Sequence, residues 1–346
     1  MNMSQGFWKS IKKPIIGLSP MDGVTDAAFR LIVAKYGNPS ISFTEFTSVE
    51  AIKYGAIKAL KAFKYSNMER PVIAQIYGKT LDAFYNATLI ACEMGFDGID
   101  INMGCPSKGV AGNGAGAALI KEPEFAKKII RTCIKASKDW SEGQNIDQND
   151  IHPDIKAFLD KLNLDFPRKL IPISVKTRIG FDTIITEEWI SNLLETKPAA
   201  ISIHGRTLKQ MYSGEANWEE IKKAAKIIKQ TETLVLGNGD IKNLTDAKSK
   251  IEYAGTDGAL IGRASFGNPW VFNGKNATLA EKLIVALEQS KAHSELLGEP
   301  FDPIKKHLCW YCKDFDGAKE TRMELMQSKN FEEVQTILKN KISQKS

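Results

Sequence analysis

The feature that most limits the fold of this chain is a regular alternation of two kinds of segment. Short β-branched runs, which favour strands, alternate with longer amphipathic segments, which favour helices. Eight such runs cover residues 14–20, 41–47, 72–77, 98–103, 171–177, 199–204, 234–238 and 258–261. Helical patterns lie between them, for example over 81–94, 125–138, 187–195 and 218–229. This alternation predicts repeated strand–helix units and a parallel sheet.

The length of the alternating region selects among parallel-sheet folds. Eight units over about 260 residues favour a closed barrel over an open doubly wound sheet, because a (β/α)8 barrel takes roughly 250 residues. The predicted fold class is therefore α/β, a (β/α)8 TIM barrel over residues 1–276. Residues 139–168 are polar and then weakly helical, and we expect a surface insertion there. Strand patterns end after 276, so residues 277–346 predict a small all-α helical C-terminal domain.

Composition narrows the class of protein. The chain has 346 residues, of which 43% are hydrophobic and 25% charged, values typical of globular proteins. No apolar run approaches the roughly 18 residues of a membrane-spanning helix, so we expect no membrane partner and a cytoplasmic protein. Five scattered cysteines indicate free thiols in a reducing compartment. The net charge of +6 permits a polyanionic partner without requiring one.

All eight predicted strands end in polar residues. In a barrel of this class the chemistry takes place at the carboxyl ends of the strands, so these residues are informative. Any one of them alone is equally consistent with an ordinary polar loop, whereas all eight together predict a functional mouth. The residues at these ends include Asp22, Glu45, Gln75, Asn102 with Cys105, Lys176 with Arg178, His204 with Arg206, Asn238 to Asp240, and Gly262 with Arg263.

Two of these strand ends are suited to binding a phosphate. Asn238, Gly239 and Asp240 follow the seventh run, and Gly262 and Arg263 follow the eighth. Glycines allow backbone N–H groups to approach an anion, and the loops after strands seven and eight are the usual phosphate-binding loops of this fold. We therefore expect a phosphorylated cofactor or substrate.

Lys176 and His204 end neighbouring strands and can place an ammonium and an imidazole against a ring that gains negative charge. A reduced flavin is such a ring. The amide of Gln75 suits the pyrimidine edge of a flavin, because it both donates and accepts. The alternative for Lys176 is a buried salt bridge with Glu45 or Asp100. Backbone and apolar contacts to the ring are expected from the end of the first strand, at Pro20, Met21 and Asp22.

Cys105 lies on a loop directly after the fourth run, where a buried structural cysteine is not expected. A positioned thiol there can act as a nucleophile or as a proton donor. Cys92, Cys133 and Cys309 lie within helical patterns and are expected in the core. Cys309 and Cys312 have CxxC spacing, but no second cysteine pair follows. Because a structural zinc ion needs four ligands, no metal site is predicted.

Several motifs resemble the signatures of tRNA-dihydrouridine synthases. They are SPMDGVTD at 19–26, DINMGCP at 100–106, VKTR at 175–178, HGRT at 204–207 and QMYSGEANW at 210–218. The resemblance extends into the tail, where residues 305–307, 310–311 and 317–318 resemble the family's helical tRNA-binding domain. Two segments depart from the family pattern: the glycine-rich stretch after Cys105 and the insertion at 139–168.

The resemblance implies an oxidoreductase that holds FMN and takes electrons from NADPH or NADH. Its reaction reduces the C5=C6 bond of uridines in tRNA to 5,6-dihydrouridine. Cys105 would be the proton donor to C5, and Asn102, Arg178 and Arg206 would contact the substrate. The alternative for Arg206 is a structural ion pair. The implied partners are tRNA and NAD(P)H, and we expect a monomer.

Two other functions remain open at this point. One is an FMN barrel oxidoreductase that acts on a free pyrimidine, like dihydroorotate dehydrogenase. The other is a catalytically silent RNA-binding module, which would not need a flavin. Residues 279–346 contain 11 Lys and Arg and 11 Asp and Glu, so an RNA surface there must come from clustered cations. The candidates, which an enzyme for free pyrimidines would not need, are Lys305, Lys306, Lys313, Lys319 and Arg322.

Overall fold

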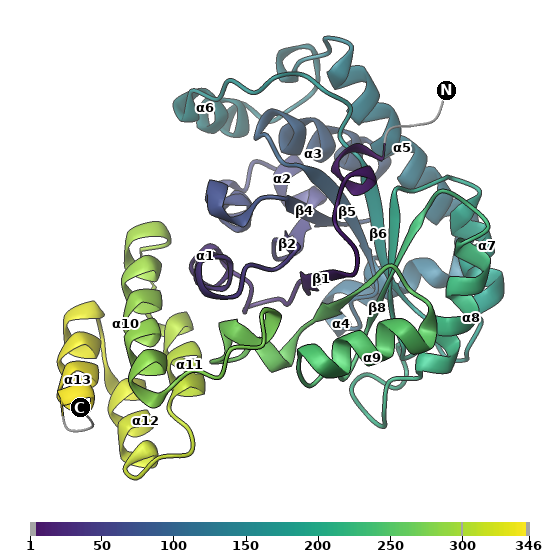
Figure 1. Ribbon diagram of the computed structural model, residues 1–346. Helices are drawn as coiled ribbons and strands as arrows, with labels where there is room; N and C mark the ends of the chain where they lie inside the picture. Colours follow the sequence, from purple (N-terminus) through teal and green to yellow (C-terminus); the bar gives the residue numbers. More distant parts are fainter. Residues whose placement is uncertain (1–4, 299, 344–346) are drawn as a thin grey trace.

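The computed structural model describes residues 5–298 and 300–343, and it contains the predicted barrel (Figure 1). All strand pairings are parallel, and the pairings of β9 with β1 and of β2 with β4 close the sheet on itself. The fold class predicted from the alternating segments is confirmed. The strands are β1 (Ile15–Leu18), β2 (Ile41–Phe43), β3 (Thr47–Ser48), β4 (Val72–Tyr77), β5 (Gly98–Met103), β6 (Ile173–Arg178), β7 (Ala200–His204), β8 (Leu234–Asn238) and β9 (Gly258–Ile261).

The second strand differs from the prediction of one continuous run over 41–47. It is divided into β2, which pairs with β1 and β4, and the short β3, which pairs only with β4. The division follows from the side chain of Thr44, whose Oγ1 accepts the backbone N–H of Gln75 at 3.0 Å. A side-chain hydroxyl therefore accepts the hydrogen bond that a backbone carbonyl of the neighbouring strand would otherwise accept. Glu45 lies in the gap between β2 and β3.

Helices surround the sheet, and four more form the tail (Figure 1). Side-chain caps set several of their first turns: Asp26 accepts from the N–H of Phe29, and Asn217 accepts from that of Glu220. The barrel helices are α1 (Ala27–Gly37), α2 (Val49–Lys53), α3 (Leu81–Glu93), α4 (Lys108–Ala111), α5 (Pro123–Ser141), α6 (Pro153–Leu162), α7 (Thr186–Leu194), α8 (Trp218–Ile228) and α9 (Leu244–Ala254). The tail helices are α10 (Leu279–Leu296), α11 (Asp302–Tyr311), α12 (Ala318–Gln327) and α13 (Phe331–Ser343).

The interior of the barrel is apolar in its amino-terminal half. Apolar side chains of the strands form a cluster inside the barrel, separate from the larger apolar core between the sheet and the surrounding helices. Trp8, from the short 3-10 helix η1 (Gly6–Lys9), is 1% exposed and packs against this inner cluster, so it closes the amino-terminal end of the barrel. The cluster inside the barrel includes Ile15, Ile41, Phe43, Ile73, Leu234, Leu236 and Leu260. The carboxyl half is left for polar residues.

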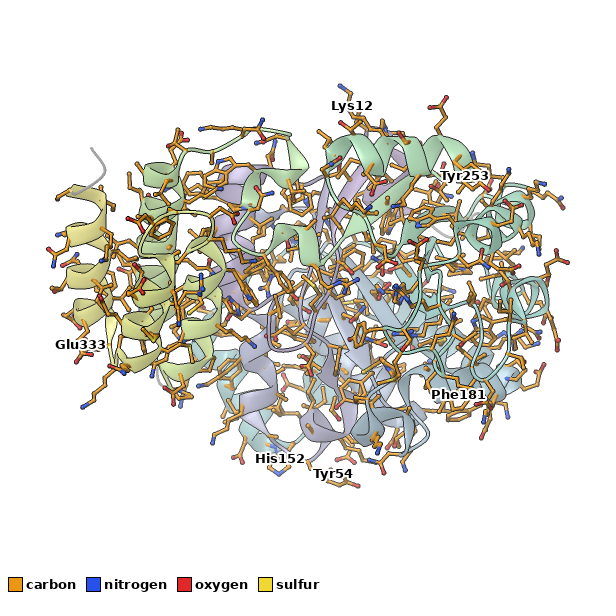
Figure 2. All side chains as sticks on the ribbon, turned by 90° about the horizontal axis from the view of Figure 1, so that it is seen from below. Lys12, Tyr54, His152, Phe181, Tyr253 and Glu333 are labelled. Carbon is orange, nitrogen blue, oxygen red and sulfur yellow. The ribbon has the colours of Figure 1, made fainter. Side chains whose placement is uncertain are left out.

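The predicted insertion packs against the barrel helices and contains α6, close to the helix expected over 154–162. Asn86 Nδ2 donates to the carbonyl of Asp150 at 2.8 Å, which holds the insertion against α3. Near the other end of the insertion, Arg168 donates to the carbonyls of Trp140 and Gln144. Figure 2 shows His152 and Tyr54 close together at one edge of the molecule, so the insertion covers the segment after α2.

The tail shares an apolar core with the barrel. Ile32 of α1 and Trp270, in the 3-10 helix η7 (Pro269–Phe272), belong to the same buried cluster as the apolar side chains of α10, α11 and α13. Phe266 and Trp310 stack with ring centroids 4.1 Å apart. Gly267 has φ +64°, and a Cβ there would lie 2.3 Å from the carbonyl oxygen of Trp310. The tail therefore docks closely beside the loop that follows β9.

Candidate functional site

The predicted site residues gather at the carboxyl end of the barrel. Pairing register places Gln75 beside Asp100, Asn102 beside Lys176, and His204 beside Asn238 on neighbouring strands. Residues two apart on a strand point to the same face, so these side chains line one polar half of the barrel interior. The polar half contains Gln75, Asp100, Asn102, Ser174, Lys176, His204 and Asn238.

Lys176 is a buried cation with a neutral hydrogen-bond partner. Its Nζ donates to Asn238 Oδ1 at 3.2 Å, and Asn238 Nδ2 donates in turn to the carbonyl of Leu260. Burial, followed by the charge of Arg178, lowers the pKa of Lys176 from 10.5 to about 8. The alternative of a direct salt bridge with Glu45 or Asp100 is not found among the described residues; Asp100 acts only as a nearby charge. Such a cation is suited to bind an anionic ligand.

His204 is uncharged at neutral pH. Burial, and then the positive charges of Lys176 and Arg178, hold its pKa well below 6.5. Its Nε2 lies 3.2 Å from an Nη1 of Arg206. Because a guanidinium only donates, Nε2 must accept, and the proton of the neutral ring is therefore on Nδ1.

Arg206 forms the structural ion pair that was its alternative role. Its guanidinium is nearly buried and donates to Asp240 Oδ2 at 2.5 Å and to the carbonyl of Gly214 at 2.6 Å. Asp240 also accepts from Arg263 at 2.7 Å and from the backbone N–H of Ala216. The contacts of Arg206 with Asp240 and Gly214 use its Nη2, and its Nη1 faces His204, whereas the buried Nε has no hydrogen-bond partner among the described residues. The hydrogen bonds that Asp240 accepts also hold its pKa below its usual value, although burial opposes this.

The two glycine turns predicted to bind a phosphate pack closely against neighbouring residues at the mouth. Gly239 has φ +128°, and a Cβ there would lie 2.5 Å from the Cβ of Ala216. A Cβ on Gly262 would lie 3.3 Å from the Sδ of Met21, so the ends of β1 and β9 meet at the mouth. The side chain of Arg263 is 61% exposed beside these turns. The lack of a Cβ thus lets the backbone of these turns lie against Ala216 and Met21, and Arg263 pairs with Asp240 at the rim.

Asn102 shapes the loop that carries Cys105. Its Oδ1 accepts the backbone N–H groups of Gly104 and Cys105 at 3.0 and 2.8 Å. Its Nδ2 donates to Gln75 Oε1 at 3.0 Å. Asn102 and Gln75, which were predicted to contact the substrate and the flavin, are therefore bonded to each other and to the loop. The thiol of Cys105 is partly exposed, with its Sγ 3.5 Å from Ser107 Oγ.

Arg178 joins two loops at the mouth. Its Nε donates to the carbonyl of Gly104 at 2.7 Å, and an Nη1 donates to the carbonyls of Thr207 and Met211. Arg178 is 3% exposed, and burial lowers the pKa of its guanidinium from 12.5 to about 10. The predicted substrate contact of Arg178 thus competes with three backbone bonds that it already makes.

Sequence reasoning missed the contribution of two buried residues, Asp100 and Ser174. Ser174 Oγ donates to Asp100 Oδ1 at 2.7 Å, and the pKa of Asp100 is raised to about 6 by burial. The period of two within the runs was a usable signal, since it places these residues on the same face as Asn102 and Lys176. Glu45, at the break in the second strand, has a pKa raised to about 7 by burial and then by Asp26.

Away from the mouth, the described chain has a groove, and it contains neither a group of three metal-ligating side chains nor a helix that could span a membrane. A groove of about 420 Å3 lies at the amino-terminal end of the barrel, lined in part by Gln5, Pro172, Pro198 and Thr233, and it contains none of the predicted residues. Within residues 5–298 and 300–343, no three His, Cys, Asp or Glu side chains are grouped to hold a metal ion. None of the helices in this part of the chain is long and apolar enough to span a membrane.

Comparison with known proteins gives a consistent assignment. The chain matches the family model for dihydrouridine synthase (Dus) over residues 17–139 and 152–346, and the omitted stretch lies within the predicted insertion. It is 32% identical to "Probable tRNA-dihydrouridine synthase 2" of Bacillus subtilis, covering 97% of this chain and 96% of that one. It is 31% identical, with the same coverage, to "Probable tRNA-dihydrouridine synthase" of Staphylococcus epidermidis.

The solved structure of a 2-naphthoyl-CoA reductase complex shares the fold, with a TM-score of 0.50 at 10% identity over 77% of this chain and 52% of that one. The match to the family model covers most of the chain, and the two relatives align along almost their whole length. The chain therefore belongs to the dihydrouridine synthase family.

Proposed function

We propose that this protein uses FMN and a nicotinamide reductant to convert uridines of tRNA into 5,6-dihydrouridine. The observation that carries the proposal is the meeting, at one barrel mouth, of a partly exposed thiol and a buried lysine that has no carboxylate partner among the described residues. Family membership supports the reaction, and the names of the two relatives support tRNA as the substrate.

The residues present fit FMN. The backbone at Gly239 and Gly262, with Arg263 at the rim, would hold the phosphate. Lys176 would face the part of the ring that becomes negative, and Pro20, Met21 and Asp22 lie at the adjoining end of β1. Bound FMN, once reduced by NADPH or NADH, would supply the hydride that C6 of the uracil receives. The neutral His204 can donate a hydrogen bond through Nδ1–H without adding charge.

Cys105 supplies the proton. A uracil must leave the base stack to enter the mouth, and its C5 then meets the loop after β5. The thiol holds a proton at Sγ, and delivering it to C5 balances the hydride at C6. Asn102 and Arg178 keep this loop in place, through its two N–H groups and the carbonyl of Gly104.

The tail would bind the folded RNA. Lys306, Lys313 and Lys319 are exposed, whereas Lys305 pairs with Asp302 at 2.6 Å and Arg322 donates to the carbonyl of Cys312. Three of the five predicted cations would therefore be free to contact phosphates, and two are used within the tail.

The proposal is tested by identifying both the bound cofactor and the reaction product. Protein purified without denaturation should be yellow, and mass spectrometry of the released ligand should identify FMN. With NADPH it should form dihydrouridine in unmodified tRNA and leave free uracil and orotate unreduced. Reduction of the free pyrimidines instead would favour the dihydroorotate dehydrogenase-like alternative. Colourless protein that FMN does not stabilise thermally would favour the silent RNA-binding module.

A further inference from the structure

Four buried polar side chains form a continuous hydrogen-bonded chain inside the barrel. Ser174 Oγ and Gln75 Nε2 both donate to the carboxylate of Asp100, each at 2.7 Å. Asn102 Nδ2 donates to Gln75 Oε1 at 3.0 Å, and Asn102 Oδ1 accepts two N–H groups of the Cys105 loop. Asp100 and Gln75 are fully buried, and Ser174 and Asn102 are nearly so.

The donor and acceptor chemistry of these groups gives the row of hydrogen bonds a single direction. An ionised carboxylate only accepts, so Asp100 forces Gln75 to turn its NH2 toward it and its oxygen toward Asn102. That oxygen in turn forces Asn102 to present its own NH2 to Gln75 and its oxygen to the loop. The opposite setting of either amide would bring two donors or two acceptors face to face in a buried site, which is costly.

We propose that Asp100 is a positioning residue for Cys105 and acts through the amide directions of Gln75 and Asn102. Its importance for catalysis rests on the proposed role of Cys105 as proton donor. Asp100 itself does not reach the mouth, since two side chains lie between it and the loop. Without an acceptor at this position, Gln75 Nε2 loses its partner, and Asn102 is then held in its direction only from the loop side, by the N–H groups of Gly104 and Cys105. The acceptor of these two N–H groups is therefore less firmly fixed.

Reversing the direction of the hydrogen bonds made by Gln75 tests this proposal. In Asn102→Asp, the new carboxylate oxygen faces Gln75 Oε1, so the amide of Gln75 must turn and present its oxygen to Asp100. In the double variant with Asp100→Asn, residue 100 can donate to the turned Gln75 and accept from Ser174, so both bonds of Gln75 are restored in the opposite direction while the bonds from Ser174 and from the loop keep theirs. At pH 8, Asn102→Asp should lower the Tm by about 3 °C, and the added Asp100→Asn should recover most of that loss.

A matched control separates hydrogen-bond direction from charge repulsion. Asp100→Leu combined with Asn102→Asp also removes the second negative charge but offers no donor to Gln75, so it should give no recovery. Equal recovery with Asn and with Leu at position 100 would overturn the directional chain, and so would simple additivity of the two substitutions.

Amide hydrogen exchange reports the effect on the Cys105 loop directly and requires no substrate. Asp100→Leu should speed exchange at Gly104 and Cys105 about tenfold, because their acceptor, Asn102, is no longer held firmly through Gln75. Asp100→Asn should stay near the wild-type rate, since Ser174 can accept from the new amide and donate to the carbonyl of Ile99, 3.4 Å away. Exchange in β7 serves as the reference for global destabilisation.

Unchanged exchange at Gly104 and Cys105 in Asp100→Leu, with the β7 reference also unchanged, would overturn the proposal. Turnover is then measured separately. Asp100→Leu should lower kcat for dihydrouridine formation while the KM for tRNA stays the same. Loop exchange that responds in a protein without dihydrouridine activity would support positioning by Asp100 and refute the proposed function. Wild-type kcat in a variant with a loosened loop would refute the link to catalysis.

Discussion

The two sides of the barrel mouth are built from different chemistry. On the side of β4 and β5, one buried carboxylate orders two neutral amides and a loop. On the side of β6 to β9, positive groups collect around Lys176, and Asp240 at the rim pairs with two of them, Arg206 and Arg263. The first side fixes geometry and the second accumulates charge. The comparison teaches that a polar mouth is not one uniform surface, because neutral amides and the cation Lys176 have different partners, with Arg178 of β6 linking the two sides through the carbonyl of Gly104.

Removing the thiol tests the geometric side most severely. Cys105→Ala should slow dihydrouridine formation by about 100-fold or more, the usual scale for loss of a general acid. Oxidation of NADPH by the bound flavin should be nearly unchanged, because the charged side of the mouth is intact. Rapid-reaction kinetics of the two half-reactions give both rates.

Cys309→Ala is the matched control for this test, since Cys309 is also partly buried but lies in the tail. It should retain the activity on tRNA. Equal activity of Cys105→Ala and wild type would assign the acid to another group.

The pH dependence of stability tests the charged side. Burial lowers the pKa of Lys176 from 10.5 to about 8, so between these pH values the unfolded chain binds more protons than the folded one. The free energy of unfolding of ligand-free protein should therefore rise with pH in this window, by about 3 kcal/mol relative to Lys176→Met. Urea unfolding at several pH values measures the difference between the two proteins.

Reduced FMN sharpens the same measurement. The negative charge of its ring beside Lys176 would favour the charged form of Lys176 and should reduce the rise between pH 8 and 10.5. An identical pH dependence in wild type and Lys176→Met would show that burial of the charged Lys176 does not destabilise the folded protein.

The rim ion pair provides a smaller effect. Asp240→Asn leaves the nearly buried guanidinium of Arg206 without its counter-ion, and Asp240 itself is only partly exposed. We expect a loss of about 1 to 3 kcal/mol in the free energy of unfolding, and a smaller loss for Arg206→Met, which removes the charge. The reverse order of the two losses would show that Arg206 contributes mainly through packing. Chemical denaturation measures both.

The tail tests whether the charged side continues beyond the mouth. Replacing Lys306, Lys313 and Lys319 by Gln should flatten the salt dependence of tRNA binding by roughly 0.7 to 0.9 in the log–log slope for each phosphate that is no longer neutralised. Lys305→Gln is the control, because Lys305 already pairs with Asp302. Binding titrations at several salt concentrations give the slopes. An unchanged slope in the triple variant would make the tail a structural cap.

The course of the barrel strands could be predicted because parallel strands buried on both faces appear as apolar runs. The gathering of Lys176, His204 and Cys105 at one end followed from the rule that strand ends carry the site. The division of the second strand could not be predicted, since it depends on one hydroxyl that replaces a carbonyl.

The partners of the site residues were harder to predict. Arg178 bonds to backbone carbonyls of two loops, and such acceptors are present at every residue of a sequence. Gln75 and Asn102 were placed correctly at the mouth, but their bonds to each other depend on strand register. The lowered pKa of Lys176 depends on burial, which its type and position alone do not reveal.

The plug formed by Trp8 has a consequence for the order of events in turnover. In the described part of the chain, this side chain and the aliphatic layer beside it fill the amino-terminal end of the barrel, so ligands of the polar half enter through the opposite mouth. In the proposed reaction, the nicotinamide and the uridine then have to enter through the same mouth, one after the other. Initial rates against one substrate, at several fixed levels of the other, should give parallel reciprocal plots, and excess tRNA should compete with the reductant.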